Sequence, residues 1–154
     1  MALIKLLYLA DRKALLEHGM PITGDRMVSM PHGPVLSSVL DFITWGDRGE
    51  SPWFKYVSEA DGYDVHLKVL ETDELSRYEL RVLEAIDDQY GRLDRWILRD
   101  ISHGLPEWQD PHGSSSPIDP ADILRAADHP PSEIERIAAE AEELWQFRAI
   151  QQRA

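Results

Sequence analysis

The start of the chain carries the strongest hydrophobic periodicity. Across residues 3–17, apolar side chains recur three and four positions apart, at Leu3, Leu6, Leu7, Ala10 and Ala14. Three further apolar residues widen this stripe, namely Ile4, Tyr8 and Leu9. A helix that is apolar on most of its sides is buried on most of its sides. We therefore expect a helix over Leu3–Glu17 at the centre of the core.

A second helix is expected to begin at Gly33-Pro34. Proline suits the first helical position because the N–H that it lacks would be unpaired there in any case. The apolar spacing continues to Trp45, and Gly46 follows as a stop. The inward positions of this predicted Pro34–Trp45 helix are Val35, Val39, Phe42 and Ile43.

A β-hairpin is predicted between residues 53 and 70. Trp53–Ser58 and Tyr63–Leu70 are rich in aromatic and β-branched residues, and they flank Asp61-Gly62, a pair suited to a tight turn. In the second run, four apolar residues alternate with polar ones: Tyr63, Val65, Leu67 and Val69. The alternation indicates one buried face. Two strands alone are marginal in water, so we expect the hairpin to pack on the helices.

Capping signals mark the next two helices. Ser76 and Glu79 have the spacing of a capping box, which predicts a third helix from there to about Tyr90. Gly91 is the expected left-handed stop. A fourth helix is expected over Leu93–His103, closed by the glycine that follows it.

The last two helices are predicted from prolines and polar caps. Asp119, followed by a proline, indicates a short helix to about Asp128, and Ser132 with Glu135 indicates a capping box for a long final helix. One face of the final helix is traced by Ile134, Ile137, Ala138, Ala141, Leu144 and Arg148. The stretch before these helices, residues 109–118, contains Gly113 and three serines between prolines, so we expect a mobile loop.

Together these elements predict a single domain over residues 1–154: a mainly α, compact helical domain of about six helices with one small β-hairpin. The 154-residue length fits one domain, and 43% hydrophobic residues exceed what a disordered chain carries. No apolar run reaches the roughly 20 residues of a membrane span. The chain has no cysteine, which excludes disulfides and thiolate chemistry and fits a cytoplasmic location.

The net charge of −12 is unevenly distributed. Residues 1–26 hold four bases and three acids, whereas residues 104–135 hold one base and seven acids. Such a chain repels nucleic-acid phosphates and anionic membranes, so neither is an expected partner. The acidic segment is either a solvated surface or a docking surface for a basic partner.

Candidate chemistry is sparse. No glycine-rich phosphate loop or nucleophile elbow occurs. The best metal candidate is the group His103, Glu107, Asp110 and His112, but its members straddle a helix end and a loop without a recognised ligand spacing. Capping and solvation explain these residues more simply, so we expect no metal and no cofactor.

The sequence also suggests roles for two histidines, each next to a glycine that interrupts an element, and for four tryptophans. We expect His32 and His103 to be orienting hydrogen-bonders, with His103 charged and bonding free carbonyls at a helix C-terminus. Core positions are expected for Trp53, Trp96, Trp108 and Trp145. For Trp108 an exposed interface anchor is the alternative.

Four segments, in order, resemble a known family. They are Lys5–Arg12, Pro21–Asp25, Met30–Ser37, and Ser102-His103 followed by Trp108. Over residues 5–108 the chain is similar to the Panacea domain, also called the SocA-like antitoxin domain. The motif falls on these residues, which the resemblance implies either bind a toxin or hold the domain together: Leu7, Tyr8, Asp11, Arg12, His32, Gly33, Pro34, Val35, Ser37, His103 and Trp108.

The resemblance implies a bacterial or phage antitoxin that neutralises a cognate toxin by direct contact and has no enzymatic activity. It also implies a possible second role as an adaptor that delivers the toxin to an ATP-dependent protease. Relatives carry another helix before the Leu7-Tyr8 segment, and this chain is expected to lack it. The apolar face left open would favour either a homodimer or a loss of stability.

Two other functions are kept as alternatives. One is a small metal-dependent hydrolase built on Asp11, His32 and His103. The other is a DNA-binding autoregulator, because short helices joined by glycine turns resemble a helix-turn-helix. Charge argues against the second, since no stretch concentrates the Lys and Arg that phosphate contacts require.

Overall fold

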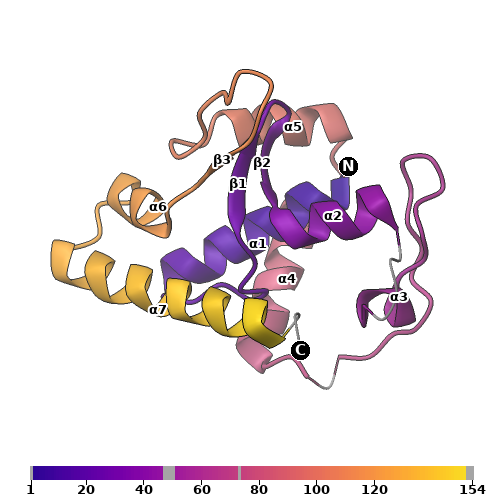
Figure 1. The fold of residues 1–154 in the computed structure, drawn as a ribbon, viewed down its shortest axis with the longest axis horizontal. Coiled ribbons are helices and arrows are strands. Elements are labelled where there is room, and N and C mark those ends of the chain that lie inside the picture. The colour runs from indigo at the N-terminus through magenta and orange to yellow at the C-terminus, as the bar shows by residue number, and fades with distance from the viewer. Residues whose placement is uncertain (1, 47–50, 73, 152–154) are drawn as a thin grey trace.

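The structure is a computed structural model that describes residues 2–46, 51–72 and 74–151. Its elements follow in this order: α1 (Ala2–His18), β1 (Met27–Met30), β2 (Gly33–Leu36), α2 (Ser37–Trp45), α3 (Trp53–Tyr56), α4 (Arg77–Tyr90), α5 (Arg95–His103), β3 (Ser116–Pro117), α6 (Pro120–Ala126) and α7 (Pro131–Gln151) (Figure 1). The mainly helical fold class is confirmed. In the described part of the chain, no helix has the length and apolar character to cross a membrane.

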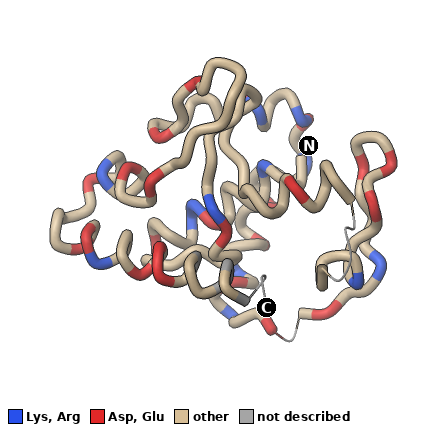
Figure 2. Tube along the Cα trace, in the orientation of Figure 1, with Lys and Arg blue, Asp and Glu red and all other residues tan. Residues whose placement is uncertain are grey.

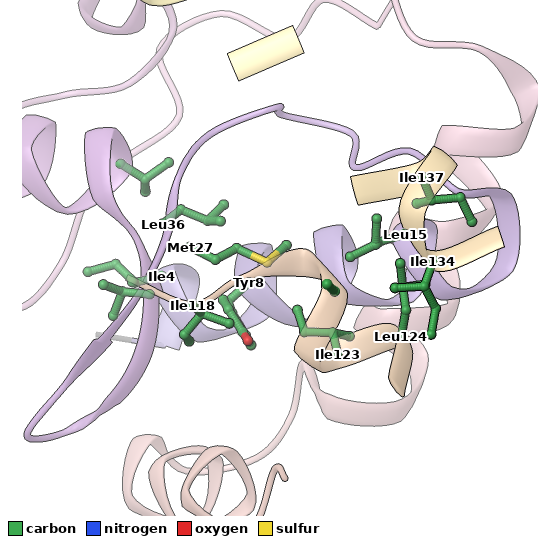
Figure 3. Close-up of a cluster of buried hydrophobic side chains, with 13 residues drawn as sticks. Ile4, Tyr8, Leu15, Met27, Leu36, Ile118, Ile123, Leu124, Ile134 and Ile137 are labelled. Carbon is green, nitrogen blue, oxygen red and sulfur yellow. The ribbon is translucent and has the colours of Figure 1, made fainter. Parts of the chain in front are cut away.

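Helix α1 lies at the centre of the core, as its nearly encircling apolar pattern predicts. On one side, Tyr8 and Leu15 face the sheet and helices α6 and α7, where Ile123 and Ile137 are buried (Figure 3). On the other side, a second cluster joins α1 to α4, with Leu9, Ala10 and Ala14 against Val82 and Ile86. Burial on two sides explains why α1 carries so few exposed polar positions.

The sheet is small and antiparallel, with the strand order β2-β1-β3. Strands β1 and β2 form a hairpin whose turn is Pro31-His32, and Val28 pairs with Val35 in its ladder. Strand β3 pairs with the other edge of β1, where Val28 faces Pro117. The far end of the expected mobile loop is thus a strand.

The expected helix start at Gly33-Pro34 is wrong, because these residues lie in β2. Strand β2 is an edge strand, where a proline costs no ladder hydrogen bond. Helix α2 instead begins at Ser37. The Asp25 carboxylate accepts hydrogen bonds from the N–H groups of Ser38 and Val39 there, at 2.8 and 3.1 Å.

The hairpin expected at residues 53–70 is correct in its turn, where Asp61 pairs with Asp64, but the two runs that flank the turn do not form regular strands. The start of the first run forms the short helix α3. The rest of that run pairs with the return segment through isolated bridges such as Val57–Leu67. The expected buried face is open, with Tyr63 72% and Leu67 64% exposed. The alternation suits a half-buried strand, but Tyr63 contacts the Arg95 guanidinium, 4.4 Å from its ring centroid, rather than the apolar core.

Two expected helix N-caps are confirmed, whereas the expected left-handed stop at Gly91 and the expected N-cap at Ser132 are not. The Ser76 hydroxyl accepts from the Glu79 N–H, and the Glu79 carboxylate accepts from the Ser76 N–H, which confirms the capping box. Asp119 caps α6 as expected. Gly91 is right-handed, with φ −62°, because its N–H continues the helix by donating to the Asp87 carbonyl. Helix α7 begins at Pro131, so Ser132 lies inside its first turn.

The tryptophans divide between core and surface. Trp53 is half-buried against the main core, whereas Trp96 is 45% exposed, which corrects its expected core position. Helix α5 turns Leu98 and Ser102 inward instead. The side chains of Trp145 and Arg148 lie outside the described residues.

Candidate functional site

The residues of the family motif come from α1, the β1–β2 hairpin, the start of α2, the end of α5 and the segment that follows it. Helix α1 packs against both β2 and α5, and α5 also packs against β2. The motif segments, separated by tens of residues in sequence, therefore meet in one region.

A buried carboxylate holds two residues of α1. The Tyr8 hydroxyl donates to Glu107 Oε1 at 2.9 Å, and Arg12 donates to both oxygens of Glu107, at 2.8 and 3.2 Å. Such two-point charged pairs are strong and fix geometry. Burial, with the negative charge of Glu107 next, raises the pKa of Tyr8 well above its ordinary value. Tyr8 therefore stays a neutral hydrogen-bond donor.

A buried lysine lies under the β1–β2 hairpin. Lys5 is 2% exposed, and its ammonium donates to the Pro34 carbonyl at 2.9 Å. Burial lowers the pKa of Lys5 to about 8. In the described part of the chain, no carboxylate forms an ion pair with this ammonium.

Gly33 fits where a larger residue cannot. Its φ of +96° lies in the left-handed region, and a Cβ would stand 2.4 Å from Ser102 Oγ and 2.8 Å from Lys5 Nζ. Side chains tolerate neither the backbone angle nor the contact. The glycine is thus required by the close approach of β2, α1 and α5.

His103 and Trp108 stack on each other near the hairpin. Their ring centroids are 4.1 Å apart with planes 6° from parallel, and Trp108 Nε1 donates to the Met30 carbonyl at 3.0 Å. Burial, followed by the positive charges of Lys5 and Arg99, lowers the pKa of His103. Its Nε2 is buried without a hydrogen-bond partner in the described residues. His103 is therefore not the charged, carbonyl-bonding residue that was expected: its ring stacks on Trp108, and its surroundings favour the neutral form. Trp108 is half-buried.

Asp11 and Asp25 tie the segment after α1 to the rest of the fold. Asp11 is fully buried, and its carboxylate accepts from the Thr23 N–H at 2.9 Å and from the Thr23 hydroxyl. Burial raises the pKa of Asp11 to about 6, against the opposing effect of these hydrogen bonds. Asp25 caps α2. Both acids therefore support the backbone.

The remaining motif positions include one exposed side chain. Pro34 and Val35 are buried, Leu7 is half-buried against the core, and the Ser37 N–H donates to the Arg26 carbonyl at 2.8 Å. His32 is exposed at the tip of the β1–β2 turn. It borders an apolar cavity of about 210 Å³, lined also by Ile4, Lys5, Met30 and Leu40.

The residues of the metal alternative do not form a ligand group, and Asp11 of the hydrolase alternative is bonded elsewhere. Glu107 is turned toward α1, whereas the His112 side chain is 92% exposed. Among the described residues, no three or more His, Asp or Glu side chains lie together in a way that could hold a metal ion. Asp11 is bonded to Thr23 rather than to either histidine of the proposed hydrolase site.

The segments that carry the family resemblance include Lys5, Thr23 and Ser102, but the resemblance assigns these three residues no role, and the sequence indicates Glu107 only as a metal ligand. The sequence does contain a signal that Lys5 has a structural role. Lys5 and Asp11 are charged residues within the apolar stripe of α1, and a charge in such a position needs a buried partner. The partners themselves are too distant in sequence for spacing to identify.

A larger hollow of about 510 Å³ lies where the end of α1 and strand β1 meet α6 and α7. Its floor contains buried apolar side chains, and its rim carries carboxylates. Figure 2 shows acidic residues along α6 and α7. We call this hollow the α6–α7 groove.

Comparison with known proteins gives one family. Residues 3–109 match the model of the family described as antitoxin SocA-like, Panacea domain. No curated protein and no solved structure matches the chain. The matched residues contain the buried Lys5, Tyr8 and Glu107 contacts described above.

Proposed function

The chain belongs to the SocA-like Panacea domain family of antitoxins, and from this membership we propose that it neutralises a cognate toxin by direct protein–protein contact. The observation that carries the proposal is the family match over residues 3–109. Within this range the side chains of Tyr8 and Asp11 are fully buried. Such residues cannot touch a partner without unfolding, so most of the family motif serves as a scaffold and the surface around it is left to bind.

A binding role also agrees with the chemistry of the motif region. The carboxylates of Asp11 and Glu107 accept hydrogen bonds from internal donors, and the His103 ring is stacked on Trp108. These are features of a rigid support. We therefore propose a non-enzymatic protein that acts in the cytoplasm beside its toxin.

The finer roles implied by the family resemblance stay predictions. They are delivery of the toxin to an ATP-dependent protease and formation of a homodimer. Adaptor activity predicts faster degradation of the toxin when this chain is added to the protease. A homodimer predicts a doubled mass by light scattering in the absence of toxin.

Co-expression with the product of the adjacent reading frame tests the proposed function. We expect that product alone to arrest growth of a bacterial host, and co-expression of this chain to restore growth. The two purified proteins should elute as one complex in gel filtration. A product that is harmless alone, or that stays toxic and unbound beside this chain, would contradict the proposal.

A further inference from the structure

The α6–α7 groove combines an apolar floor with an acidic rim. The floor includes Leu15, Met27 and Ile118, which are 0%, 6% and 7% exposed, together with Ala138 and Ala141 on α7. A volume of about 510 Å³ lies within the range of about 300–1,000 Å³ that is usual for ligand-binding clefts. The groove can therefore take more than one side chain of a partner.

The rim charge is strongly one-sided. Four acids line the groove, namely Asp25, Asp119, Asp122 and Glu142, and Arg26 is the one base among the described lining residues. The groove also borders the acidic segment 104–135, which holds seven acids and one base. An apolar cleft whose rim carries charges of one sign concentrates the electric field and favours partners that carry the opposite charge.

Three of the rim carboxylates accept hydrogen bonds from neutral donors. Asp25 accepts from backbone N–H groups at the start of α2, and Asp119 accepts from the Ala121 N–H. Glu142 accepts from the neutral amide of Gln146 at 3.2 Å. Neutral donors orient a carboxylate without cancelling its charge. Asp122 differs, because it pairs with Arg125.

We propose that the α6–α7 groove is the docking surface for a basic segment of the toxin, with an apolar side chain on the floor and Lys or Arg side chains at the rim. This inference rests on the proposed function. A second copy of this chain fits less well, because it carries the same net charge of −12. Opposed charges at the rim speed association and select the partner, while apolar contact on the floor slows its release.

Glu142→Lys tests the docking surface, with Glu143→Lys as the matched control. Both residues are exposed on α7 and both changes shift the net charge equally, but only Glu142 lines the groove. We expect Glu142→Lys to weaken binding of the purified product of the adjacent reading frame about tenfold at 0.1 M salt. Glu143→Lys should stay within about twofold of the unchanged chain, since exposed charges away from an interface are screened.

Thermal melts of both variants must match that of the unchanged chain, which separates docking from folding. A Lys→Glu or Arg→Glu change in the partner that restores the affinity of Glu142→Lys supports the proposal and identifies the basic segment. Equal losses of affinity in both variants, or no loss in either, would overturn the groove as the docking surface. The proposed function would be unaffected by that result. A self-association that Glu142→Lys abolishes would also overturn the groove as the toxin's docking surface, in favour of a second copy. Failure of the unchanged chain to bind at all instead contradicts the proposed function.

Discussion

Tyr8 and Glu107 share a buried hydrogen bond of 2.9 Å although 99 positions separate them in sequence. The bond joins the first helix to the end of the family-matched segment at residues 3–109. Arg12, one turn further along α1, holds the same carboxylate. This contact closes the segment on itself and makes the matched region one structural unit.

Tyr8→Phe should lower stability without changing toxin binding by the folded protein. The variant removes one donor to Glu107 and leaves the carboxylate with Arg12, so we expect a loss of about 1–2 kcal/mol. Urea unfolding beside a toxin-binding assay measures both effects. Tyr63→Phe is the control, because Tyr63 is 72% exposed. Lost binding with unchanged unfolding would assign Tyr8 to the interface instead.

Glu107→Gln should cost more than Tyr8→Phe. Removing one partner of a fully buried ion pair costs about 3–5 kcal/mol, and because Arg12 is 19% exposed we expect about 2–3 kcal/mol. The matched control is Glu17→Gln, which removes an exposed pair with Lys13 and should change stability by less than about 1 kcal/mol. Chemical denaturation at pH 7 gives both values. Similar losses of stability in Glu107→Gln and Glu17→Gln would contradict a buried network around Glu107.

Gly33→Ala and Gly62→Ala separate a close contact from backbone strain. Both glycines have positive φ, +96° and +64°, but a Cβ meets Ser102 and Lys5 at the first position and nothing within 4 Å at the second. We expect Gly62→Ala to cost about 1 kcal/mol and Gly33→Ala about 3 kcal/mol, since overpacking adds to strain. Adding Ser102→Ala to Gly33→Ala should recover part of the loss. Equal costs at the two glycines would contradict the tight packing of β2.

The prediction of the fold succeeded where one local pattern decides the outcome. The apolar ring of α1 and the capping box of Ser76 and Glu79 need no knowledge of distant residues. Gly33-Pro34 is different, because proline suits both a helix start and an edge strand. Gly33-Pro34 forms a strand because it pairs with β1 in the hairpin, and that pairing depends on the whole sheet.

The site was less predictable than the fold for the same reason. The motif residues were located by resemblance, but their roles depend on contacts such as Lys5 with Pro34 and Tyr8 with Glu107. Trp96 shows the converse error, since a large apolar residue on a short amphipathic helix can face solvent as α5 turns Leu98 inward. Spacing along one helix does not show which face its neighbours cover.

Lys5 should make stability rise with pH above neutrality. Burial lowers the pKa of Lys5 from 10.5 to about 8 in the folded protein. Between these values the unfolded chain binds more protons than the folded one, so the free energy of unfolding increases with pH across that window. Below it, both states carry the charge and the folded protein bears the full cost of burying it.

Comparison with Lys5→Met isolates this effect, because other titrating groups are shared by the two proteins. Methionine keeps the apolar stem and removes the charge, so the variant should equal or exceed the unchanged chain in stability at pH 7. From pH 7 to 11 the unchanged chain should gain on the order of 3 kcal/mol relative to the variant. Urea unfolding at unit steps of pH measures the difference, and Lys13→Met, at a more exposed lysine of α1, is the control for removing one positive charge from this helix. A difference between the unchanged chain and Lys5→Met that stays constant with pH would mean that Lys5 keeps an ordinary pKa, and that the hairpin does not cover it as the structure shows.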